Sequence, residues 1–177
     1  MHNFDADVVD ELYKVAAINL CSNMPGQVAL GIMVNPPRRG DHSYPQFIRE
    51  KQALIDSLGR RARLITDAFN QLEGIVCQET EGAMYSFPQI TLPRAFMEYA
   101  KAKGKAPDVL YCLELLHETG LSCVPGSGFQ QKANTFHFRT TILPDEAVFP
   151  DIIKRFSSFH TNLMKKFGAG GGPRSRL

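Results

Sequence analysis

Hydrophobic positions recur at helical spacing in three long segments of the chain. Over residues 46–72 the apolar side chains step by three or four positions, which predicts a helix roughly 40 Å long. The same spacing predicts helices over residues 6–20 and 145–167, each with an aspartate near its start. A shorter helix is expected over residues 107–120, with proline near its start and glycine at its end.

Short apolar runs bounded by glycine and proline separate the later helices. They predict strands over residues 74–77, 82–88, 121–124 and 135–143. A sheet of short strands with helices packed on it indicates an α+β fold, with a mixed or antiparallel sheet.

The pattern also predicts how the chain is organised. We expect a long connecting helix over residues 46–72, a small domain over 73–167 and a tail over 168–177. Residues 1–45 hold a helix that Met24–Gly26 is expected to break, a second apolar stretch over 28–34 and a loop rich in proline, which is too little for a domain. Their apolar face needs a cover, from another chain or from the rest of a longer protein.

Composition narrows the classes of function. The 20 Lys and Arg residues nearly balance the 18 Asp and Glu residues, so no field across the whole chain favours nucleic acid. No apolar run is long enough for a membrane span, and the N-terminus lacks the features of a secretory signal. The four cysteines form no C-x-x-C pair and the histidines lack metal-ligand spacing, so we expect reduced thiols, no metal site and an intracellular protein.

Arg139 is the most informative polar position. Alternation along the strand places Phe136, Phe138 and Ile142 on one face and His137 and Arg139 on the other. A guanidinium in an apolar strand needs a partner, and its planar fork suits a carboxylate or a phosphate. The pattern leaves open a ligand role, an internal ion pair and a solvated edge strand.

Three motifs then point to a family. The segments GAMYSFP (82–88), CVPGSGF (123–129) and HFRTTILP (137–144) resemble, in this order and spacing, the C-terminal domain of alanine aminotransferases. LCSNMPGQ (20–27) and the long helix match as well, so the resemblance covers about residues 3–167. It implies fold type I and pyridoxal phosphate as cofactor. It also implies a homodimer that acts on amino acids and 2-oxo acids, with residues 1–45 as the last helices of a large domain.

The resemblance also implies roles for residues. Arg139 would bind the substrate carboxylate, Gly126, Ser127 and Gly128 would form a tight connection near the active site, and Tyr85 would line it. Gln130 stands where the family usually has glycine, which puts the conformation of that loop in doubt.

None of the chain's lysines stands in the motif that carries the Schiff-base lysine of this family. We therefore expect no catalytic residue in this chain, no covalent cofactor and no activity of the chain alone. The intact protein would move an amino group between L-alanine or L-glutamate and pyruvate, 2-oxoglutarate or glyoxylate. The alternative is an inactive, stand-alone interaction module with the same fold.

The last three residues, Ser175, Arg176 and Leu177, resemble the peroxisomal S-K-L address. They follow a segment rich in glycine. If they act as an address, the protein is peroxisomal and belongs with the glyoxylate-using transaminases; otherwise it is cytoplasmic.

Overall fold

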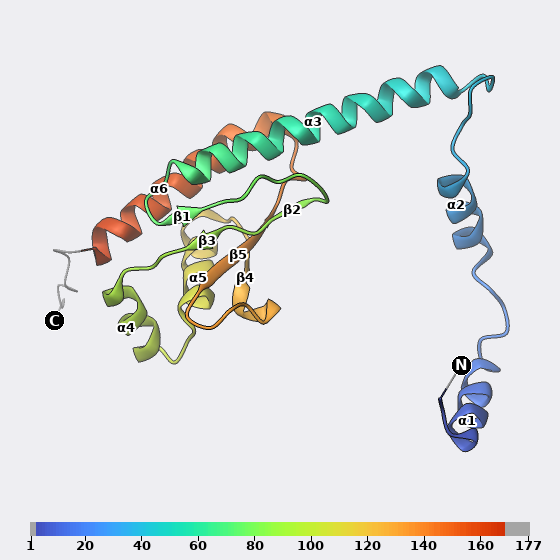
Figure 1. Ribbon diagram of the computed structural model, residues 1–177, viewed down its shortest axis with the longest axis horizontal. Helices are drawn as coiled ribbons and strands as arrows, with labels where there is room; N and C mark the ends of the chain where they lie inside the picture. The colour runs from blue at the N-terminus through green and yellow to red at the C-terminus, as the bar shows by residue number, and fades with distance from the viewer. Residues whose placement is uncertain (1–2, 169–177) are drawn as a thin grey trace. The chain divides into compact units, whose positions relative to one another are not determined.

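The computed structural model describes residues 3–168 (Figure 1), and its contacts divide the chain into two compact units. The first unit is Met1–Glu50 and the second is Lys51–Leu177. The long helix α3 (Tyr44–Asn70) begins in the first unit and continues into the second, and its bounds agree with the predicted helix to within two residues at each end.

The first unit holds two helices without buried residues, α1 (Ala6–Ala16) and α2 (Met24–Val34). Helix α1 is capped by the side chain of Asp5, as predicted, but it ends before residue 20. The α-helical pattern stops there because the N–H groups of Ile18 and Asn19 donate to carbonyls three residues back, as in a 3₁₀ turn, and not four.

The two helices are separate, as expected, but the break lies before Met24–Gly26 and not at these residues. The Asn23 side chain accepts a hydrogen bond from the N–H of Gly26 at 3.0 Å, and Pro25 occupies the first turn of α2. Proline is compatible with a first turn because the N–H that it lacks would have no helical partner there. The segment therefore starts a helix instead of breaking one.

The second unit contains a small antiparallel sheet around one central strand. Its strands are β1 (Ile75–Val76), β2 (Tyr85–Ser86), β3 (Gln89–Ile90), β4 (Val124–Pro125) and β5 (Phe136–Thr141). Strand β5 pairs with β2, β3 and β4, and β1 pairs with β3. The fold is α+β, as expected, and every pairing is antiparallel.

The predicted strand over residues 82–88 is shorter in the structure. Only β2 lies within it, and β3 follows after Phe87 and Pro88. Pro88 cannot donate to the ladder, but its carbonyl accepts a hydrogen bond from the N–H of Phe138 at 3.3 Å. Helix α4 (Arg94–Ala102) was not predicted.

The remaining helices follow the sequence pattern closely. Helix α5 (Pro107–Thr119) ends at Gly120, whose φ of 73° is the left-handed conformation that favours glycine. Residues Gly126–Phe129 form a short 3₁₀ helix, η1. A second 3₁₀ turn, η2 (Glu146–Val148), capped by Asp145, precedes the last helix, α6 (Phe149–Phe167).

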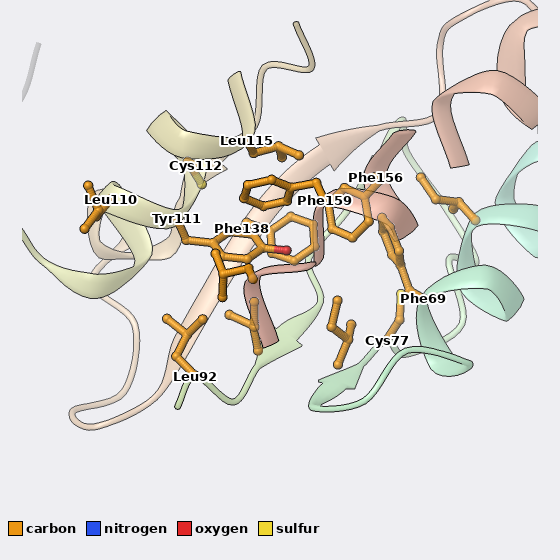
Figure 2. Close-up of a cluster of buried hydrophobic side chains, with 14 of the residues drawn as sticks. Phe69, Cys77, Leu92, Leu110, Tyr111, Cys112, Leu115, Phe138, Phe156 and Phe159 are labelled. Atoms are coloured by element: carbon orange, nitrogen blue, oxygen red, sulfur yellow. The ribbon is translucent and has the colours of Figure 1, made fainter. Parts of the chain in front are cut away.

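One face of β5 is the centre of the core. Phe138 is fully buried, and its ring lies 5.5 Å from that of Phe69 in α3, 5.4 Å from Phe156 in α6 and 6.0 Å from Tyr111 in α5. Figure 2 shows this aromatic cluster on one side of the strand. Phe138 and Ile142, which alternation predicts on one face of the strand, are both buried.

Helix α3 is fastened to the end of β5 by two arginines. The buried Arg61 donates from Nη1 to the carbonyls of Leu143 at 2.9 Å and Pro144 at 2.6 Å. Arg60 forms a salt bridge with Glu146 at 2.7 Å, and its hydrogen bond lowers the pKa of that carboxyl to about 2.

Candidate functional site

The outer face of β5 carries Arg139. Residues directly opposite each other in an antiparallel pair share a face of the sheet. The register pairs Arg139 with Val124, His137 with Gln89, and Thr141 with Tyr85. The outer face therefore brings Arg139 together with Tyr85, as the sequence suggested for two residues of one site.

Two aromatic rings flank the guanidinium of Arg139. Its Cζ atom lies 4.5 Å from the ring centroid of Tyr85 and 4.9 Å from that of Phe129. Each such contact at a half-exposed position stabilises the charge by about 0.5–1 kcal/mol. Ring faces leave the N–H groups of the guanidinium available for an anion, because the attraction is to the π electrons.

No internal counter-charge holds Arg139 within residues 3–168. No salt bridge or hydrogen bond joins its guanidinium to any of these residues, and its exposure is intermediate. Of the three alternatives that the sequence left open, the internal ion pair is therefore absent from the described part of the chain. A planar, undercoordinated guanidinium between two rings is suited to bind a carboxylate bidentately.

The loop after β4 places the ring of Phe129. Gly126 lies so close to β5 that a Cβ atom there would meet the Gln131 side chain, and would lie 2.8 Å from His137 Cβ and 2.9 Å from the His137 carbonyl oxygen. Gln130 ends the turn in the left-handed conformation, with φ of 53°. This conformation favours glycine, so the sequence departs from the family pattern at a position where glycine has a physical advantage.

The buried carboxylate of Asp108 is hydrogen-bonded to this loop. Asp108, in the first turn of α5, accepts hydrogen bonds at Oδ2 from the Ser127 N–H at 2.6 Å and from Gln131 Nε2 at 3.0 Å. The oxygen Oε1 of Gln131 then accepts from His137 Nδ1 at 3.0 Å, because its nitrogen is committed to the carboxylate. The Asp108 side chain is 1% exposed.

His137 stands beside Arg139 on the same face. Its ring stacks on Phe87 at 4.9 Å between centroids, and Phe87 in turn meets Phe129 edge to face at 5.6 Å. Burial lowers the pKa of His137, while the Asp108 charge acts to raise it. The ring therefore favours its neutral form, and it offers the site an apolar wall instead of a second positive charge.

Known proteins resemble this chain over nearly its whole length. It is 54% identical over 167 residues to "Glutamate--glyoxylate aminotransferase 1" of Arabidopsis thaliana, a match that covers 94% of the chain and 35% of that relative. It is 51% identical over 164 residues to "Alanine aminotransferase 2" of Panicum miliaceum, covering 93% of the chain and 34% of that protein. Over the part that it spans, the chain is similar to alanine and glutamate–glyoxylate aminotransferases. This confirms the resemblance inferred from the three motifs.

The chain spans about a third of the length of these aminotransferase relatives. Among solved structures, "Alanine aminotransferase from Pyrococcus furiosus" aligns with a TM-score of 0.62 at 26% identity, over 91% of this chain and 36% of that one. An aminotransferase from Escherichia coli aligns at 20% identity with a TM-score of 0.59, which supports the fold alone. No protein-family profile matches the chain.

The structure gathers some of the residues that the aminotransferase motifs singled out, and adds others. Arg139 and Tyr85 are in contact, Gly126 packs on β5, and Ser127 contributes its backbone N–H. Gly128 makes no close approach, since a Cβ atom there would meet nothing within 4 Å. The residues Ser175, Arg176 and Leu177 lie outside the described residues.

Sequence reasoning missed three residues around the arginine. Phe87 and Phe129 lie inside motifs that were quoted, and their apolar character at exposed positions of a strand and a turn could have been noticed. Asp108 could not, because an aspartate in a first helical turn usually serves only the helix dipole.

The groups gathered around Arg139 do not fit a pyridoxal phosphate cofactor. Among residues 3–168, no ring contact or hydrogen bond of Arg139, Tyr85 or Phe129 involves a lysine amine. A single guanidinium between rings suits a carboxylate better than it suits a phosphate ester that must also be bound through an imine.

The described residues offer neither a metal-binding cluster nor a membrane-spanning helix. No group of three His, Cys, Asp or Glu residues in the described part of the chain could hold a metal ion. Among the same residues, no helix combines the length and the apolar character that crossing a bilayer requires.

Proposed function

We propose that this chain is the C-terminal part of an aminotransferase that moves an amino group between L-alanine or L-glutamate and a 2-oxo acid such as pyruvate, 2-oxoglutarate or glyoxylate. The observation that carries the proposal is Arg139, flanked by Tyr85 and Phe129 and without a counter-charge in residues 3–168. The relatives are named as aminotransferases, so they give no support to an inactive interaction module.

Within this proposal the chain's own residues bind and orient the substrate. The guanidinium of Arg139 would hold the carboxylate that amino acids and 2-oxo acids share, through two N–H donors. Tyr85 and Phe129 would keep the guanidinium in the plane that suits this carboxylate and exclude water from its faces. The resemblance implies pyridoxal phosphate as the cofactor of the intact protein, and the residues around Arg139 would not be the ones that hold it.

A chimera tests the proposal. The matching part of the Arabidopsis glutamate–glyoxylate aminotransferase is exchanged for this chain, and activity is measured with alanine, glutamate and glyoxylate. Arg139→Gln should lower kcat/KM for amino and oxo substrates alike, because both carry the carboxylate. The loss should correspond to about 3–5 kcal/mol of activation free energy.

Lys132→Gln is the matched control, because it removes one positive charge from the same exposed loop region without touching Arg139. Its kcat/KM should stay close to that of the parent chimera. Equal kinetics for the parent and Arg139→Gln would contradict the carboxylate role.

The proposal includes a homodimer, as the resemblance implies. It also includes a peroxisomal location, supported by Ser175, Arg176 and Leu177. A fluorescent protein carrying the last ten residues should enter peroxisomes, and removing these three residues should leave it in the cytosol. Sedimentation of the intact protein tests the dimer.

A further inference from the structure

Asp108 is a buried carboxylate with no salt-bridge partner among residues 3–168. It is 1% exposed, and its oxygen Oδ1 makes no hydrogen bond within residues 3–168. The carboxylate is held through Oδ2, which accepts from the Ser127 N–H and from Gln131 Nε2. The first turn of α5, where Asp108 stands, offers only a partial positive charge.

Such a group is costly to bury. An ionised carboxylate loses the favourable hydration of its charge, and two N–H donors and a helix end offset only part of that loss. What the carboxylate provides in return is an acceptor for the Ser127 N–H and for the Gln131 amide. These two hydrogen bonds fix two segments next to Arg139.

The first segment is the turn Gly126–Phe129. The bond from Ser127 to Asp108 anchors this turn at its beginning, and Phe129 at its end lies over the guanidinium of Arg139. Without the anchor, the turn would depend on the close packing of Gly126 against β5 alone.

The second segment runs through Gln131 to His137. Because the carboxylate can only accept, the amide nitrogen of Gln131 faces Asp108 and its oxygen faces His137. His137 must then carry its proton on Nδ1. The oriented imidazole stacks on Phe87, whose ring supports the edge of Phe129.

We propose that Asp108 is a positioning residue for the carboxylate site. Its oxygen Oδ2 orders both the turn that carries Phe129 and the imidazole of His137. Through them it fixes the orientation of the Arg139 guanidinium. This inference rests on the proposed function for the identity of the bound group, but the ordering of Arg139 can be measured without any ligand.

The test uses the 177-residue chain and two substitutions at one position. Asp108→Ala removes both hydrogen bonds. Asp108→Asn keeps an oxygen that can accept both and removes the charge, and it places its amide nitrogen where Oδ1 makes no bond. Glu118→Gln is the matched control, because it neutralises an exposed carboxylate on the same helix.

Three NMR readouts separate positioning from general stability. They are the ring-current shift of the Arg139 side chain, the tautomer of His137 from its ¹⁵N shifts, and the affinity for added 2-oxoglutarate. Asp108→Ala should reduce the ring-current shift, mix the tautomers and weaken 2-oxoglutarate binding about tenfold. Asp108→Asn should retain all three within about twofold in affinity, with a lower pKa for His137 because the Asp108 charge acts to raise it.

An Asp108→Ala chain that folds with the Arg139 shift and the His137 tautomer unchanged would overturn the inference. If that chain does not fold, Gln131→Ala decides: it should mix the His137 tautomers, and an unaltered tautomer would overturn the inference. Arg139→Gln separates the two proposals. If it leaves 2-oxoglutarate affinity unchanged, the proposed function fails, while the ring-current and tautomer data still decide the role of Asp108.

Discussion

The two faces of strand β5 use the same kinds of residues for different ends. On the inner face, Phe138 is surrounded by other rings and fully buried. On the outer face, the rings of Tyr85, Phe87 and Phe129 stay 42–45% exposed around Arg139 and His137. An aromatic ring on the inner face contributes mainly to stability, whereas one on the outer face contributes mainly to the state of a charged or polar neighbour.

Truncating the inner ring should give the largest effect on stability. Phe138→Ala leaves a cavity among Phe69, Tyr111 and Phe156, and should lower the free energy of unfolding by about 3–5 kcal/mol in a urea titration. Phe129→Ala, on the outer face, should cost less than about 1 kcal/mol. Similar losses for the two variants would show that the faces do not differ in this way.

A methyl group at Gly126 should disturb the outer face next. Its Cβ would press on the Gln131 side chain and on the backbone of β5 at His137, which cannot move cheaply. We expect Gly126→Ala to lower the free energy of unfolding by about 1–3 kcal/mol. Gly128→Ala is the control, and should stay within about 0.5 kcal/mol because nothing lies near its Cβ.

The core histidine should add a pH dependence that sharpens the comparison. His160 is buried, bonded to the Tyr111 hydroxyl and the Glu73 carbonyl, and burial lowers its pKa below 6.5. Folding then favours neutral imidazole, so its contribution is fully present above pH 6.5 and is lost as the pH falls through the folded pKa.

Thermal melts between pH 7 and 5 check this prediction. The melting temperature of the parent chain should fall more steeply with acid than that of His160→Asn, which has no imidazole to protonate. Parallel curves would mean that His160 does not contribute to the acid sensitivity.

The smallest effect is expected at Gln130. Its left-handed conformation is strained for a residue with a Cβ, so Gln130→Gly should raise the free energy of unfolding by about 0.5–1 kcal/mol. Lys132→Gly, at a nearby residue that does not have a positive φ, should instead lower the free energy of unfolding. A loss of stability in Gln130→Gly would show that this turn does not need the glycine conformation.

Much of the fold was predictable because periodicity is strong where the elements are long. The helices around Phe69 and Phe156 and the alternation through Phe138 follow from spacing alone. Helix α4 and the split of the predicted strand at Phe87 and Pro88 were missed, since short elements are set by pairing partners rather than by their own pattern.

The site was predictable only in part, for a related reason. Arg139 stands out because a charge in an apolar strand is unusual, and motif resemblance added Tyr85. The ring of Phe129 reaches the site through the turn that precedes β5, and the carboxylate of Asp108 acts from α5, which lies further back in the sequence. Their roles depend on tertiary contacts, which no local pattern encodes.

Arg61 links α3 to the chain that follows β5. Its side chain donates hydrogen bonds to two carbonyls just after β5, and these bonds restrain the end of the strand against the helix. The chain that follows β5, the strand that carries Arg139, is therefore held to α3. A buried side chain can in this way support a binding site without contacting the ligand.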